Sequence, residues 1–72
     1  MQTFRHIFRT EQETIKSKAR ECYGFDAFYS WFLQTYAEQM TEYEQDNMAQ
    51  NIPALRAVFE SNSTFHRQYH RK

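Results

Sequence analysis

The chain has 72 residues, and its nine basic and nine acidic side chains give a formal net charge of zero at pH 7. A chain of this length forms one small domain, which buries only about 60% of its unfolded surface and needs dense packing or a partner for stability. The balanced charge argues against a protein that coats DNA or an anionic membrane with its whole surface.

The sequence contains seven Phe, five Tyr and one Trp against a single Gly and a single Pro. The apolar mass therefore consists mainly of aromatic rings, and the low Gly and Pro content favours long helices. We expect an all-α fold, with residues 1–72 as a single helical domain and a small bundle of three to four helices.

The single cysteine, Cys22, excludes a disulfide within the chain, and the sequence has no CxxC or Cys/His framework for a structural metal. The first ten residues lack the apolar run of a signal peptide, and no 18-residue apolar stretch could span a bilayer. We expect a cytoplasmic protein without cofactor or membrane contact.

The N-terminal third predicts one helix with a short lead. Thr10 and Glu13 have the spacing of a capping box, which predicts a helix over residues 10–23. Residues 1–9 form either a flexible arm or a short helical lead. One helical stripe collects the apolar residues of both segments, namely Phe4, Phe8, Ile15, Ala19 and Cys22.

The clearest periodicity predicts a long central helix over residues 26–48. Gly24 is placed to end the preceding helix, and Asp26 is available as the N-cap of the new one. At 100° per residue, one arc of about 140° collects eight apolar residues. They are Phe25, Phe28, Tyr29, Phe32, Leu33, Tyr36, Met40 and Tyr43.

Trp31 lies about 60° outside that arc, beyond Phe28. A side chain of this size off the apolar stripe either covers a neighbouring element or marks a contact surface. Because interface hot spots favour Trp, Tyr and Arg, we take Trp31, Phe28 and Tyr29 as candidate partner-binding residues.

A third helix is predicted after residue 50, with Asn51 as its cap and Pro53 in its first turn. The polar run 61–64 favours the end of this helix, because its side chains bond to the backbone. Ser63 could cap a last short helix over residues 63–72. The buried face of the third helix would consist of Ile52, Leu55, Val58 and Phe59.

The segment HRQYHRK holds the most concentrated charge, and a basic segment with an aromatic residue can hold phosphates while a ring stacks on a base. Arg5, His6 and Arg9 could add to this patch if the termini meet. The alternative is that these basic residues lie at the C-terminal end of a helix, where the exposed carbonyl groups attract cations. The candidate nucleic-acid-binding residues are His66, Arg67, Tyr69, His70, Arg71 and Lys72.

Two further patterns have simple structural explanations. His66 and His70 have the spacing of two metal ligands on a helix, with Glu60 or His6 as the third, but surface histidines explain them better, and we predict no metal site. The acidic residues Glu38, Glu42, Glu44 and Asp46 could imitate a phosphate backbone, although a solvated face is the simpler interpretation.

Nothing in the sequence indicates catalysis, because it has no nucleophile elbow, no glycine-rich phosphate loop and no paired carboxylates in an apolar run. Cys22 lies on the buried stripe, where a thiol behaves as a small hydrophobic group. We therefore predict a protein that is not an enzyme and has no catalytic residues.

The second half contains FYSWFLQTY (28–36), then DNMAQNI, VF and NSTF, with Tyr69 four residues further on. This series is similar to the YozE family of small bacterial proteins over residues 27–72. The resemblance implies a helical fold like the sterile alpha motif and a bacterial setting. Met48-Ala49 would correspond to the family's Leu-Ala pair, and Val58-Phe59 to its Phe-Pro turn, which here lacks the proline.

These observations favour a non-enzymatic interaction module, a small inhibitor or a regulator, encoded by a bacterium, phage or plasmid. Its partner would be another protein, bound through exposed aromatic side chains, and a homodimer is a natural variant because a short domain gains core by sharing it. The alternative function is nucleic-acid binding through the basic C-terminal segment.

Overall fold

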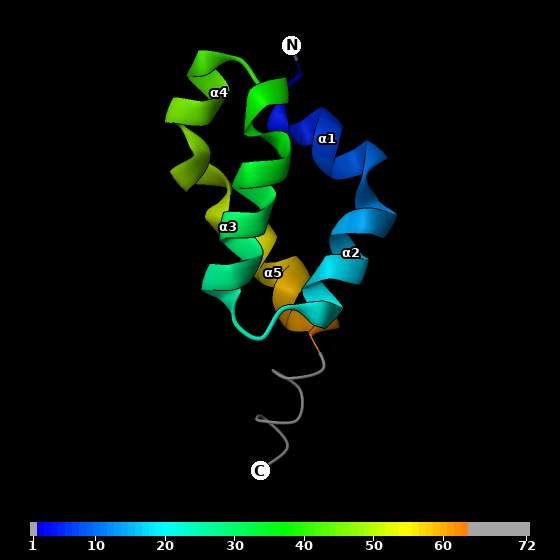
Figure 1. The fold of residues 1–72 in the computed structure, drawn as a ribbon. Helices are drawn as coiled ribbons and strands as arrows, with labels where there is room; N and C mark the ends of the chain where they lie inside the picture. Colours follow the sequence, from blue (N-terminus) through cyan, green and yellow to red (C-terminus); the bar gives the residue numbers. More distant parts are fainter. Residues whose placement is uncertain (1, 64–72) are drawn as a thin grey trace.

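The computed structural model describes residues 2–63, which form five α-helices joined in part by two short 3-10 helices (Figure 1). The all-α prediction is confirmed for this part of the chain, where the only extended pairing is an isolated bridge between Gln2 and Met40. In chain order the elements are α1 (Phe4–Thr10), α2 (Gln12–Glu21), α3 (Phe25–Tyr36), η1 (Ala37–Gln39), α4 (Glu42–Asp46), η2 (Met48–Asn51) and α5 (Ile52–Asn62).

The helices α2, α3 and α5 pack against one another and form the body of the bundle. Figure 1 shows α2 and α3 on opposite sides of α5, with α1 and α4 at the end where the chain begins. None of the helices in residues 2–63 is long and apolar enough to cross a membrane.

Aromatic and aliphatic side chains of α1, α2, α3, η2 and α5 meet in one core together with Met40, whereas α4 and η1 contribute no buried side chain. Phe32 is fully buried, and its ring centroid lies 5.6 Å from that of Phe4 and 4.9 Å from that of Tyr36. Burial of each large apolar side chain stabilises the fold by about 1.5–3 kcal/mol. The largest apolar side chains with almost no exposed surface are Phe28, Phe32, Ile7, Ile15, Met40 and Leu55.

The predicted central helix over residues 26–48 is wrong in its length, because α3 ends at Tyr36. Met40 is fully buried in an extended conformation, and the Gln2 N–H donates to the carbonyl of Gln39 at 2.7 Å. The chain then restarts as α4. Tyr43, which a continuous helix would place toward the core, is 71% exposed.

The predicted helix over residues 10–23 is also divided, with a break at Glu11 between α1 and α2. The expected cap at Thr10 is wrong, because its hydroxyl donates to the His6 carbonyl at 3.0 Å inside α1. Thr3 caps α1 instead, since its hydroxyl accepts the His6 N–H at 3.2 Å. Of the two alternatives for the lead, the helical one is therefore correct.

The boundary between α2 and α3 differs from the prediction as well. The helix α2 ends at Glu21 with Cys22 as its C-cap, so Gly24 does not end it. Gly24 is instead the N-cap of α3, with φ −145° and ψ 166°, and Asp26 lies within the first turn. An extended backbone at the N-cap is the usual geometry of that position.

The predicted third helix is confirmed as α5, with Pro53 in its first turn and Ser63 as its C-cap. Its predicted buried face is correct in direction: Leu55 and Phe59 are buried, whereas Ile52 and Val58 are half-buried. The predicted last helix after Ser63 falls on residues 64–72, outside the described residues.

Candidate protein-interaction surface

The three aromatic residues predicted to bind a partner lie in three different environments. Phe28 has no exposed surface and is part of the core. Phe28 is therefore corrected from a contact residue to a core residue, because the helical stripe that includes it faces α2 and α5. Trp31 and Tyr29 are half-buried and stay candidates for contact.

Trp31 and Tyr29 cannot belong to one contact surface. Two residues apart on an α-helix, they point about 160° away from each other. The Tyr29 ring stacks on Phe25 with 5.8 Å between centroids, and the Arg56 guanidinium of α5 lies 4.4 Å from the Phe25 ring. Tyr29 thus lies on the flank of α3 beside α5.

Trp31 lies on the other flank, along the seam between α2 and α3. Its indole stacks on Phe28 at 6.0 Å and 20°, and it meets the Tyr36 ring edge-on at 5.7 Å and 86°. The sequence left two alternatives for Trp31: it covers a neighbouring element, or it marks a contact surface. The structure supports the first, because Lys18 of α2 lies over the indole. The half-buried indole also keeps part of its surface accessible.

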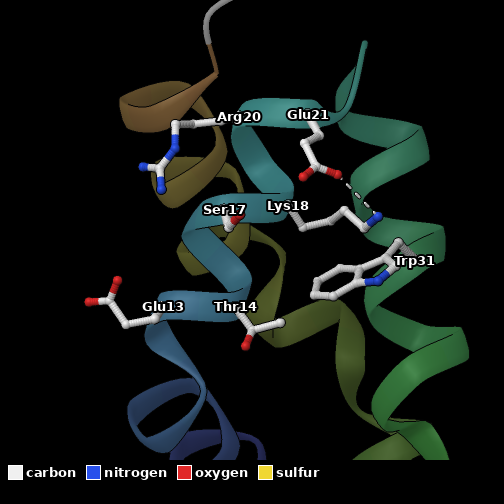
Figure 2. Close-up of a pocket in the computed structure, with 7 residues that line it drawn as sticks. All are labelled: Glu13, Thr14, Ser17, Lys18, Arg20, Glu21 and Trp31. Atoms are coloured by element: carbon white, nitrogen blue, oxygen red, sulfur yellow. Dashed lines mark hydrogen bonds and ion pairs between the residues drawn. The ribbon is translucent and has the colours of Figure 1, made fainter.

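An open hollow of about 550 Å³ lies at this seam. Figure 2 shows the indole of Trp31 on its α3 side. The Nζ of Lys18 lies 5.8 Å from the indole centroid, within the range of a cation–π contact. The same Nζ donates to Glu21 Oε1 at 3.4 Å. The hollow is lined by Glu13, Thr14, Ser17, Lys18, Arg20, Glu21 and Trp31.

The charges around the hollow are divided between its two sides (Figure 2). Lys18 and Glu21 extend toward Trp31, whereas Glu13 and Arg20 point away from the indole. The Arg20 guanidinium donates to the side-chain oxygen of Asn62 at 3.4 Å and so links α2 to α5. The indole therefore has one cation and one carboxylate close to it.

Sequence reasoning identified Trp31 but missed Lys18 and Glu21. These two have the i, i+3 spacing of a helical ion pair, a signal that the sequence does contain. Their position over Trp31 could not be read from that spacing, because it depends on how α2 packs against α3. The contact surface is thus a tertiary feature.

Two other hollows lie elsewhere on the described residues. One of about 640 Å³ lies between α1 and α4, where Glu44 Oε1 accepts the Phe4 N–H at 2.8 Å. This bond also corrects the prediction that Glu44 belongs to a solvated acidic face, whereas Glu38, Glu42 and Asp46 are exposed. The other, about 180 Å³, is lined by Phe8, Gln12, Ile15, Lys16 and Val58.

Burial raises the pKa of two titratable groups in the described residues, Cys22 and Tyr36. It raises the pKa of the Cys22 thiol, with an opposing effect from Lys18 and a reinforcing one from Glu21. Burial also raises the pKa of Tyr36, whose hydroxyl donates to Glu11 Oε1 at 3.3 Å. Within residues 2–63, no group of three or more His, Cys, Asp or Glu side chains could hold a metal ion.

The residues predicted for nucleic-acid binding lie outside the described residues, as do His66 and His70 as possible metal ligands. Arg5, His6 and Arg9 are exposed on α1. Figure 1 places α1 and the last turn of α5 at opposite ends of the bundle. Nucleic-acid binding through His66, Arg67, Tyr69, His70, Arg71 and Lys72 stays a prediction.

Comparison of the chain with protein-family models, with curated proteins and with solved structures finds no significant match. The resemblance to the YozE family therefore stays a prediction.

Proposed function

We propose that this protein is a non-enzymatic interaction module, a small inhibitor or regulator, that binds a partner protein through the seam between α2 and α3. The observation that carries the proposal is the position of Trp31. Its indole contacts three core rings, and it borders an open hollow that is also lined by Lys18 and Glu21.

The physical reason is that a rigid, half-buried indole costs little conformational entropy when a partner covers it. Tryptophan has few rotatable bonds, and the contacts to Phe28 and Tyr36 already restrict them. Covering the rest of the ring would remove apolar surface from water. Interface hot spots accordingly favour Trp, set in a pocket and surrounded by polar residues.

Tyr29 provides a matched comparison, because it is also a half-buried aromatic residue of α3 but lies on the opposite flank. A partner seated on the seam covers Trp31 and leaves Tyr29 exposed. The same helix thus offers one residue that the proposal requires and one that it does not.

The test is quantitative capture of proteins from extracts of the cells that encode the chain, with three immobilised forms: wild type, Trp31→Ala and Tyr29→Ala. The proposal predicts a protein retained by wild type and by Tyr29→Ala and reduced about tenfold or more by Trp31→Ala, the usual effect of a hot-spot truncation. Equal retention by all three forms, with circular dichroism showing that each is folded, would contradict it.

A further inference from the structure

Trp31 and Glu21 together have the chemistry of a cation-binding site, and Lys18 of the same chain occupies it. An indole face attracts a cation through its quadrupole, and a nearby carboxylate adds to that attraction. Trp31 and Glu21 supply these two parts, and the Lys18 ammonium lies between them, 5.8 Å from the indole centroid and 3.4 Å from Glu21 Oε1.

Lys18 fits this position only loosely. The 5.8 Å distance is near the outer limit for a cation–π contact, about 6 Å. The Lys18 side chain is 35% exposed and that of Glu21 is 66% exposed, so both can move without opening the core. The hollow beside them remains open, with Thr14 and Ser17 as small neighbours.

We infer that the hollow beside Trp31 receives an arginine side chain of the partner protein, which displaces Lys18 from the indole and binds the Glu21 carboxylate. This inference rests on the proposed function and names the chemistry of the partner. A guanidinium suits the site better than an ammonium, because its planar group stacks on an aromatic ring and offers paired donors to a carboxylate.

The charge distribution supports a basic ligand over an acidic one. Once Lys18 moves aside, the charged group on the indole's side of the hollow is Glu21 (Figure 2). The other cation of the lining, Arg20, points away and donates to Asn62, so it is engaged by α5. An incoming carboxylate would meet Glu21 as a like charge.

Trp31 is the only tryptophan, so its fluorescence reports directly on this site. The full chain is titrated with a blocked Gly-Arg-Gly peptide and with the neutral counterpart in which citrulline replaces arginine. The expected result is a saturable change in emission with the arginine peptide and none of comparable size with the citrulline peptide. Equal responses to the two peptides would overturn the inference.

Variants test the displacement itself. Lys18→Gln removes the internal cation and is expected to bind the arginine peptide about two- to fivefold more tightly than wild type, the range of an exposed cation–π contact. Glu21→Gln is expected to bind it more weakly. Lys18→Met, which keeps most of the apolar stem, serves as a second uncharged variant, and circular dichroism verifies that each variant is folded.

Two results would contradict the inference in different ways. Unchanged or weaker binding of the arginine peptide by both Lys18 variants would show that Lys18 is no competitor. Binding of a blocked Gly-Glu-Gly peptide that is lost in Lys18→Gln would assign the hollow to an acidic ligand. Either result leaves the capture experiment with Trp31→Ala as a separate test of the proposed function.

Discussion

Trp31 has two roles at the scale of single residues, because one side of its indole packs on the core and the other borders the hollow. Its ring contacts Phe28, Phe32 and Tyr36 within the chain. The helical wheel placed this residue correctly off the main stripe. It could not indicate how far the core rings would extend beneath the indole, since that depends on the packing of α3 against α2.

We predict that Trp31→Ala lowers the free energy of unfolding by about 1–2 kcal/mol, because a half-buried ring loses part of its apolar contact. Phe32→Ala, one position away and fully buried, should cost about 3–5 kcal/mol through the cavity that it leaves. Urea unfolding followed by circular dichroism measures both. Equal losses for the two variants would make Trp31 a core residue without an interface role.

Tyr36 gives a prediction about pH. Burial and the neighbouring Glu11 raise its pKa above the ordinary 10.0, so the folded state favours the protonated phenol. Stability from this group is fully present below pH 10 and is lost as the pH rises through the raised value. Tyr36→Phe removes the group, so wild type should exceed the variant in stability at pH 7 by about 1 kcal/mol, with the difference shrinking above pH 10.

Urea unfolding of both proteins between pH 7 and pH 11 measures this difference. Cys22, whose pKa is also raised, is present in both proteins, so its effect cancels. A difference that stays constant up to pH 11 would mean that Tyr36 titrates no differently in the folded and unfolded chains.

At the scale of the element, hydrogen bonds to the first N–H groups help to set where helices begin. One of these bonds joins two helices that are far apart in the sequence, α4 and α1. Thr41 caps its own helix α4, because its hydroxyl accepts the Glu44 N–H at 3.2 Å. Phe4 is the first residue of α1, and its N–H donates to the Glu44 carboxylate at 2.8 Å. Glu44 thus adds to the Thr3 cap by binding the first N–H of a helix that begins forty residues earlier in the chain.

We predict that Glu44→Ala lowers the free energy of unfolding by about 1–2 kcal/mol, because it removes this hydrogen bond to the backbone. Glu42→Ala is a matched control, since Glu42 is exposed and lies in the same first turn of α4, where a carboxylate interacts favourably with the helix dipole. Its cost should stay below about 0.5 kcal/mol. Thermal unfolding compares the two variants, and equal costs would show that the Phe4 contact contributes nothing.

Local sequence signals predicted most helices but not their breaks. The first turn and the end of α5 followed from Pro53 and from the polar run near Ser63, whereas the start of α3 was predicted with the wrong cap residue. The break after Tyr36 was not predicted, because residues up to Tyr43 continue the helical pattern. The spacing of Thr41 and Glu44 was the one local signal for a restart, and it competed with a longer apolar stripe.

The break is explained by the whole core rather than by local propensity. A continuous helix would leave Met40 on the extension of α3, whereas the turn buries it completely and brings Gln39 within hydrogen-bond distance of Gln2. Tertiary packing therefore overrides the helical pattern here. The contact between Lys18 and Trp31 was unpredictable for the same reason, since it joins two helices whose packing the sequence pattern did not specify.

For the whole molecule, the bundle holds two aromatic flanks of α3 in different surroundings, and we propose that one of them binds the partner. The flank of Trp31 faces α2 and borders the open hollow, whereas the flank of Tyr29 stacks on Phe25 beside α5. The core shared by α2, α3 and α5 keeps these surfaces apart. A partner can therefore bind one without covering the other.

The most direct measurement is an NMR titration of the full chain with the captured partner, in which amide and indole N–H shifts are followed residue by residue. The account predicts that the largest shifts occur at the Trp31 indole and along residues 13–21 of α2, with Tyr29, Tyr43 and Arg56 unchanged. Shifts centred on the flank of Tyr29 or on α4, with the Trp31 indole unmoved, would contradict it.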